Sequence, residues 1–225
     1  MSAFFVTATG TDIGKTFVAA GLLRALREQK KVVAAIKPVI SGFDPARARA
    51  SDTGVLLDAM GEAVTPDAIE QISPWRFAAA LSPDMAAARE NREINFDKLV
   101  AYCRDAAAWP GTLLIEGVGG VMVPLDGRHT VLDWMAALGL PAILVAGSYL
   151  GTISHTLTAL DAMKRAGVTI AALVVNHSGD GAVPLADTVA SLGRFAPEIP
   201  IVTIDRGAKN FGELASLLFQ RVTQS

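Results

Sequence analysis

The chain has 225 residues, of which 51% are hydrophobic and 19% are charged, a balance that excludes disorder over most of its length. A formal net charge of −2 leaves no basic surplus for binding a nucleic-acid backbone. The most apolar stretch, 138–147, contains Pro141 and is about half as long as a membrane-spanning helix, so we expect no membrane partner. We expect a single domain over 1–225 in the cytoplasm, where the one cysteine would stay reduced.

Short apolar runs alternate with helical patterns along the chain. Because these runs do not alternate apolar with polar residues, they are typical of strands buried on both faces. The predicted strands are 3–7, 31–37, 112–116, 141–146, 169–176 and 200–205. The predicted helices are 16–29, 96–108, 153–165, 184–194 and 210–222. This order predicts an α/β fold with a doubly wound, mostly parallel sheet and helices on both faces, and the long irregular region 38–95 is expected to be functional.

A glycine-rich segment joins the first predicted strand to the first predicted helix. Its glycines, Gly10 and Gly14, allow backbone N–H groups to close on phosphate oxygens at a helix N-terminus. Lys15 would then reach the β- and γ-phosphates, and the Thr16 hydroxyl would bind Mg²⁺. The strict pattern has glycine where this chain has Thr9, so the segment predicts a variant of the phosphate loop of P-loop NTPases. The alternative is an ordinary glycine-rich turn, and the glycine spacing does not favour dinucleotide binding.

Charged side chains stand where two other predicted strands end. Glu116 ends the third strand and could hold Mg²⁺, or it could pair with an arginine or cap the glycine loop that follows. Lys37 ends the second strand and could neutralise a transferring phosphoryl group, with little effect on fold stability. It could also be a strand-end lysine that buries only its stem. Asp52 alone favours helix capping, and Ser41 alone indicates nothing specific.

Six segments in this order resemble the dethiobiotin synthetases, the ATP-dependent enzymes of biotin synthesis. The segments are the phosphate loop 9–16, KPVISG at 37–42, SD at 51–52, SP at 82–83, EGVGG at 116–120 and LGTISH at 150–155. In addition, Asn176 closes a strand where the family has an asparagine that reads adenine. The chain departs from the family pattern at Ala8, Asp12, Ala80, Asp84 and Ser154, where glycine, glutamate, proline, histidine and asparagine are usual.

The resemblance implies a role for each matching residue. Lys15 and Lys37 would be the catalytic pair that holds phosphates, with Lys37 also near the reacting carbamate. The Mg²⁺ ligands would be Thr16, Asp52 and Glu116. The nucleotide site would comprise Asp12, Ile13, Gly14, Lys15, Thr16, Phe17, Asp52, Glu116, Gly117, Val118, Gly119, Asn176, Ile204, Asp205 and Arg206. The diamine site would comprise Ser41 together with Gly151, Thr152, Ile153 and Ser154 from the second subunit of a homodimer with shared active sites.

The activity implied by the resemblance is ATP-driven ring closure of 7,8-diaminopelargonate with CO₂, which gives dethiobiotin, ADP and phosphate. Such a reaction needs positioning and charge neutralisation more than a strong base. The main alternative is a P-loop regulatory ATPase of the partition or septum-positioning class, whose members carry an extra lysine where this chain has Gly10. A cobyrinate-amidating enzyme would need a glutaminase domain, for which 225 residues leave no room. A small-molecule kinase stays open on the sequence alone.

Overall fold

The computed structural model describes residues 2–177 and 183–222, and six parallel strands form its central sheet. The strands lie in the order β2-β5-β1-β6-β7-β8, so the chain builds first towards one edge of the sheet and then towards the other. Their bounds are β1 Ser2–Ala8, β2 Val33–Ile36, β5 Thr112–Glu116, β6 Ala142–Gly147, β7 Ile170–Asn176 and β8 Ile201–Ile204. The doubly wound parallel sheet predicted from the sequence is therefore confirmed.

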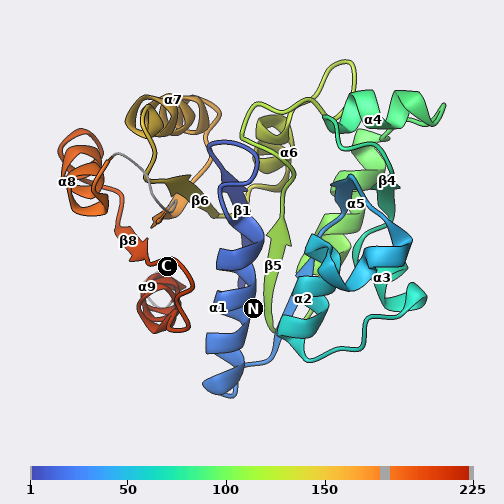
Figure 1. Cartoon of the computed structure of the whole chain (residues 1–225), viewed down its shortest axis with the longest axis horizontal. Helices are drawn as coiled ribbons and strands as arrows, with labels where there is room; N and C mark the ends of the chain where they lie inside the picture. Colours follow the sequence, from blue (N-terminus) through green and yellow to red (C-terminus); the bar gives the residue numbers. More distant parts are fainter. Residues whose placement is uncertain (1, 178–182, 223–225) are drawn as a thin grey trace.

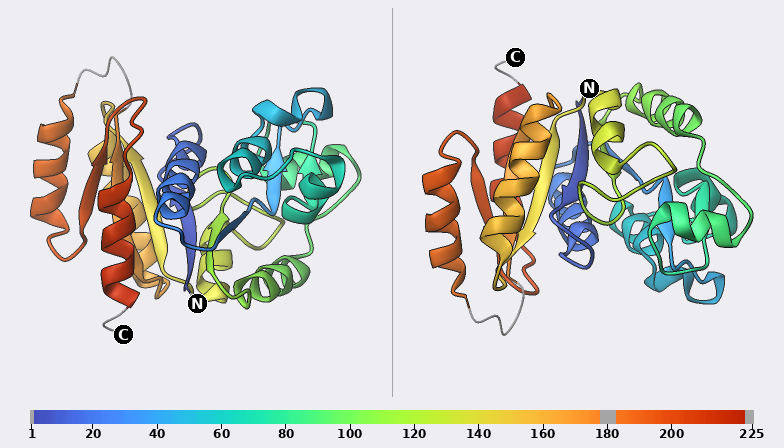
Figure 2. Two further views of the ribbon diagram at one scale, coloured as in Figure 1. Left: turned by 90° about the horizontal axis from the view of Figure 1, so that it is seen from below. Right: turned by 90° about the horizontal axis from the view of Figure 1, so that it is seen from above.

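Helices cover both faces of this sheet (Figure 1). Helix α1 contacts α2 and α9, whereas α7 contacts α8 and α5 contacts α6. Figure 2 shows β8 between α8 and α9, which places these two helices on opposite faces. The bounds are α1 Lys15–Glu28, α2 Asp52–Met60, α5 Phe96–Ala107, α6 Val131–Leu138, α7 Thr152–Arg165, α8 Leu185–Phe195 and α9 Gly212–Val222. In the described ranges, no helix combines the length and apolar character needed to cross a membrane.

Several side chains on the central strands of the sheet are fully buried. Phe5, Ile115 and Leu144, on three adjacent strands, are all 0% exposed. Trp134 of α6 closes this core from one face, because its ring packs edge-on against Phe5 with centroids 4.8 Å apart. Since all six strands are parallel, their carboxyl ends meet at one edge, where loops rather than core side chains follow. That edge is where the candidate site is built.

The region between β2 and α5 holds several short elements that lie beside the main sheet, on the side away from α8 (Figure 1). Two of its strands form a separate parallel sheet. The elements are β3 Val39–Ser41, the 3₁₀ helix Pro45–Ala50, α3 Pro66–Ile72, β4 Trp75–Phe77 and α4 Pro83–Arg89. This small sheet was not predicted from the sequence, and neither was α6, whose start is marked by a reciprocal cap between Thr130 and Asp133.

Candidate active site at the carboxyl edge of the sheet

The phosphate loop connects β1 to α1 and is held against the neighbouring strand. The Thr9 N–H donates to the Val145 carbonyl at 3.0 Å, which continues the sheet one residue past β1. Gly14 has φ +100° and sits at the N-cap of α1, a conformation that glycine adopts without the strain of a Cβ. Lys15 therefore begins the helix, and its ammonium folds back towards the loop, 3.3 Å from the Gly10 carbonyl. The predicted strand–loop–helix arrangement is present.

Lys15 is a buried lysine among other charges. It is 7% exposed, and burial lowers its pKa from 10.5 to about 8. The positive charge of Lys37 contributes to this lowering of the pKa, while Glu116 and Asp52 oppose it. A lysine that is costly to keep protonated gains more than an exposed one when an anion binds beside it. Its position and its pKa both suit a phosphate ligand.

Lys37 lies one residue past β2 and is only 2% exposed. Its ammonium donates to Glu116 Oε1 at 2.7 Å and to the Gly117 carbonyl at 2.8 Å, and it pairs with Asp52 Oδ2 at 3.0 Å. Burial alone would lower the pKa of Lys37, but the two carboxylates raise it above its usual value. Lys37 is therefore a buried ion-pair partner, and its burial favours an effect on fold stability, contrary to the expectation from the sequence.

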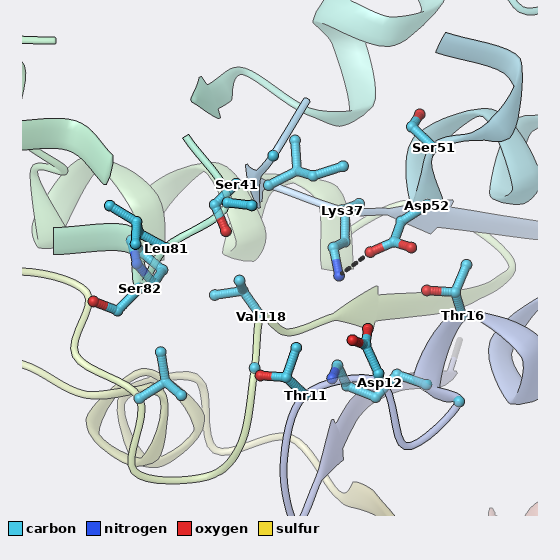
Figure 3. A pocket seen from close by; sticks show the side chains of 18 of the residues that line it. Thr11, Asp12, Thr16, Lys37, Ser41, Ser51, Asp52, Leu81, Ser82 and Val118 are labelled. Atoms are coloured by element: carbon cyan, nitrogen blue, oxygen red, sulfur yellow. Dashed lines mark ion pairs between the residues drawn. The ribbon is translucent and has the colours of Figure 1, made fainter. Parts of the chain in front are cut away.

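Asp52 reaches the same ammonium from α2 (Figure 3). The sequence alone favoured helix capping by Asp52, but the cap is Ser51, whose hydroxyl accepts the Gly54 N–H at 3.2 Å. The Asp52 carboxylate is thereby left for the cavity. Although burial alone would raise the pKa of Asp52, the charge of Lys37 and hydrogen bonds from Lys37 and Thr16 lower it. Asp52 thus stays ionised in the site.

Thr16, Asp52 and Glu116, the Mg²⁺ ligands that the resemblance implies, lie close together in the structure. The Thr16 hydroxyl donates to Glu116 Oε1 at 2.7 Å, across 100 residues of sequence. Glu116 is 0% exposed, and its second oxygen, Oε2, is a buried atom without a hydrogen-bond partner in the part of the chain described here. Two carboxylates and one hydroxyl are oxygen ligands of the kind that Mg²⁺ prefers. The unpaired Oε2 of Glu116 favours binding of a positively charged group beside this carboxylate.

A cavity of about 800 Å³ opens above these residues. Asp12 of the phosphate loop and Thr16 of α1 line it on one side, and Ser41 and Ser82 line it on the other (Figure 3). The predicted site residues along its wall are Asp12, Gly14, Lys15, Thr16, Lys37, Ser41, Asp52, Val118 and Gly119. The wall residues to which our sequence analysis gave no role are Thr11, Ile40, Gly42, Ala50, Ser51, Ala80, Leu81, Ser82, Pro83 and Val123. The family-like segments at 37–42 and 82–83 were the available signal for several of these.

Other predicted site residues are not on the described wall of this cavity. Gly117 contributes its carbonyl to Lys37. Asn176 ends β7, and its side-chain amide donates to the Ile13 carbonyl at 3.0 Å. Phe17 is on the first turn of α1. Ile204 is a buried residue at the end of β8, and Asp205 and Arg206 follow it as exposed residues.

The segment 151–154 begins α7, after β6, and none of its residues is on the described wall of this cavity. Gly151 is exposed and has φ +95°. The Thr152 hydroxyl donates to the Gly147 carbonyl at 2.7 Å, and its N–H donates to the Tyr149 carbonyl. Thr152 is also 1% exposed, so its side chain holds its own loop together, and its place in a diamine site shared with a second copy stays a prediction. Ser154 is exposed and Ile153 is half-buried.

Comparison with known proteins identifies the family. Residues 2–204 match the family described as an AAA domain. The ATP-dependent dethiobiotin synthetase BioD of Acidiphilium cryptum (strain JF-5) is 52% identical over 202 residues, which cover 89% of this chain and 91% of that protein. The enzyme of the same name from Caulobacter sp. (strain K31) is 48% identical over 225 residues, covering 99% and 96%.

A solved structure agrees in fold alone. The septum site-determining protein MinD from Pyrococcus horikoshii OT3, solved with Mg-ADP, has a TM-score of 0.55 and 19% identity, with 96% of this chain and 86% of that chain covered. Likeness at that identity carries the P-loop architecture but not the activity. Each of the two synthetases is about 50% identical to this chain, over most of this chain and most of its own length. The chain therefore belongs to the ATP-dependent dethiobiotin synthetases.

Proposed function

We propose that the cavity beside the phosphate loop is where this enzyme uses ATP to join its diamine substrate to CO₂. The observation that carries the proposal is the pair of buried lysines, Lys15 and Lys37, set beside two carboxylates at one edge of an 800 Å³ cavity. Buried, fixed positive charges stabilise negative charge that develops during phosphoryl transfer more strongly than solvated ones do. The arrangement suits a reaction that proceeds through a phosphorylated intermediate.

The reaction has three steps. One amine of 7,8-diaminopelargonate adds to CO₂ and loses a proton, which forms a carbamate. A carbamate oxygen then attacks the γ-phosphorus of ATP and the bond to ADP breaks, which gives a carbamic–phosphoric anhydride. The second amine attacks the carbamate carbon and loses a proton, phosphate leaves, and the ureido ring closes. No strong base is needed, so the enzyme acts mainly by alignment and charge neutralisation.

Lys15 and Lys37 have different roles in this proposal because they lie at different places in the site. Lys15, at the start of α1, is placed to bind the terminal phosphates, and the nucleotide's negative charge would keep it protonated. Lys37 is held by Glu116 and Asp52 on one side and faces the cavity that Ser41 also lines. It would neutralise the carbamate and the phosphoryl group as they approach each other. A fixed cation at that point favours the transition state over the separated reactants.

Thr16, Asp52 and Glu116 would hold Mg²⁺, which would neutralise phosphate charge during transfer. The buried Oε2 of Glu116 and the ionised Asp52 support this assignment. Cation binding would compete with Lys37 for these two carboxylates, because all of them share the same few oxygens. Metal binding and the Lys37 ion pairs are therefore coupled in this proposal.

The diamine would lie along the far wall of the cavity. Ser41 offers a hydroxyl there, and Ile40, Leu81 and Val118 offer apolar surface for an aliphatic chain. We further propose a homodimer in which Gly151 and Ser154 of a second copy reach the substrate carboxylate. The apolar side chain of Leu150 supports this contact surface, because it is 82% exposed next to Gly151. A cytoplasmic location is also part of this proposal.

The test is ATP turnover with and without diamine plus bicarbonate. We expect phosphate release to depend on both co-substrates and to accompany dethiobiotin formation. A regulatory ATPase of the partition class would hydrolyse ATP without them. Lys15→Ala should lose most of this coupled turnover, and turnover close to that of the unmodified enzyme would contradict the roles assigned here.

A further inference from the structure

The side chain of Asn176 makes a contact that its predicted role does not require. Its Nδ2 donates to the carbonyl of Ile13, 163 residues away in sequence, at 3.0 Å. Only the amino group can occupy this place, because an amide oxygen there would face another acceptor. This contact uses one of the two amide N–H donors on the phosphate loop, and it leaves the second N–H and the amide oxygen for other partners.

Asn176 stands on a well-fixed part of the backbone, so its side chain can fix the position of a neighbouring segment. It is the last residue of β7, which pairs with β6 on one side and with β8 on the other. The next residue, His177, donates its N–H to Ile204, so the backbone stays fixed one step past the strand. The side chain thus extends from the end of the sheet to Ile13 of the phosphate loop.

The contact fixes one particular peptide. The Ile13 carbonyl and the Gly14 N–H belong to the same planar trans unit, so they point in opposite directions. When Asn176 holds the carbonyl, the Gly14 N–H must point away from Asn176, and Gly14 is on the wall of the cavity. Backbone N–H groups at a helix N-terminus are the donors that bind phosphate. The direction of one such donor is therefore set by Asn176.

Packing reinforces the hydrogen bond. A Cβ added to Gly14 would lie 2.3 Å from Asn176 Nδ2, so the amide occupies the space that a side chain there would need. Gly14 also has φ +100°, where a residue with a Cβ is strained. The Asn176 amide can pack against the loop because Gly14 has no side chain.

We propose that Asn176 is a positioning residue for the phosphate loop, which supports phosphate binding whether or not a base is present. The inference rests on the phosphate-binding role proposed above for Lys15 and the phosphate loop. It differs from adenine recognition in one measurable respect. A ligand that has the phosphates of ATP and no base should still sense the loss of the Asn176 amide.

The experiment measures inorganic tripolyphosphate binding, with Mg²⁺ present, by competition against a fluorescent ATP analogue. Asn176→Asp keeps the side-chain volume but replaces the donor with an oxygen that repels the Ile13 carbonyl, and Asn176→Ala removes the contact. We expect both variants to bind tripolyphosphate at least roughly fivefold more weakly, the effect of one lost hydrogen bond. Asn95→Ala is the matched control, because it removes one side-chain hydrogen bond of similar length, to the Lys98 N–H on α5, far along the chain from the loop. The control should bind tripolyphosphate normally.

Unchanged tripolyphosphate affinity in both Asn176 variants, with weakened ATP binding, would overturn the inference and leave Asn176 as a base-reading residue. Lys15→Ala separates this failure from a failure of the proposed function. If Lys15→Ala also binds tripolyphosphate normally, the loop is not the phosphate site and both proposals fall.

A thermal melt checks that each variant is folded. Combining Gly14→Ala with Asn176→Ala gives a second reading, since their effects should be less than additive if the two side chains share one space, and strict additivity would contradict the packing argument.

Discussion

Replacing Lys37 with methionine should destabilise the whole fold as well as the reaction. The change keeps an unbranched apolar side chain of similar reach but leaves Glu116, which is 0% exposed, without its buried cation. Breaking a buried ion pair by removing one partner costs about 3–5 kcal/mol, because a charge remains in a dry environment. That is a large share of a typical domain stability of roughly 5–15 kcal/mol. We therefore expect Lys37→Met to show a clearly lowered free energy of unfolding.

Arg24→Met provides the matched control. Arg24 also pairs with a carboxylate, Asp58, at 2.8 Å, but both side chains are largely exposed. Removing an exposed pair costs about 0–1 kcal/mol, so this variant should unfold almost like the unmodified protein. Urea titrations followed by circular dichroism would give both values at neutral pH. If Lys37→Met loses no more than Arg24→Met, the burial argument is refuted and Lys37 is a surface lysine in energetic terms.

The remaining predictions concern nucleotide binding and assembly. Because Lys15 has a pKa of about 8 in the free protein, its ammonium is present below that pH and lost above it, so isothermal titration should show ATP affinity falling as pH rises through about 8. Lys15→Arg, which stays protonated, should weaken this dependence, and an equally steep fall in that variant would contradict the assignment. For the proposed shared site, mixing inactive Lys15→Ala with Gly151→Trp should restore about a quarter of full activity, since half of the randomly assorted dimers would each hold one intact site. Gly167→Trp, at another positive-φ glycine near the other end of α7, should stay active alone, and a fully active monomer would refute the dimer.

Local sequence was enough for the parts of the site that are continuous in the chain. The phosphate loop was predictable because a buried strand, two glycines and the Lys15–Thr16 pair follow one another within a few residues. Glu116 was predictable as a strand-end carboxylate, since β5 is an uninterrupted apolar run. The alternation of strands and helices then required a parallel sheet whose carboxyl ends meet. These inferences depend on chain order and on side-chain type alone.

What could not be predicted depends on distances across the fold. Whether Asp52 caps its helix or faces the cavity is decided by Lys37, which approaches from a different strand end, and by Ser51, which takes the cap. By propensity alone, Ser51 and Asp52 are both good helix caps. The burial of Lys37 was hidden for a related reason, because a lysine at a strand end gives no sign of the carboxylate that will cover it. The contact between Asn176 and Ile13 spans 163 residues and leaves no local pattern at all.

The charges of the site explain why its parts need one another. Lys15 and Lys37 carry two positive charges, and Asp52 and Glu116 carry two negative ones, so the four side chains balance before any ligand binds. The balance is uneven in space, because both carboxylates are drawn to Lys37 while Lys15 is left with a lowered pKa. An arriving phosphate therefore meets a cation that gains from its charge, in a place where little water competes. A divalent cation bound by the two carboxylates would in turn loosen their hold on Lys37. In the proposed reaction the ammonium of Lys37 would then become available to the reacting carbamate when metal and nucleotide are in place, which would tie charge neutralisation to a complete set of substrates.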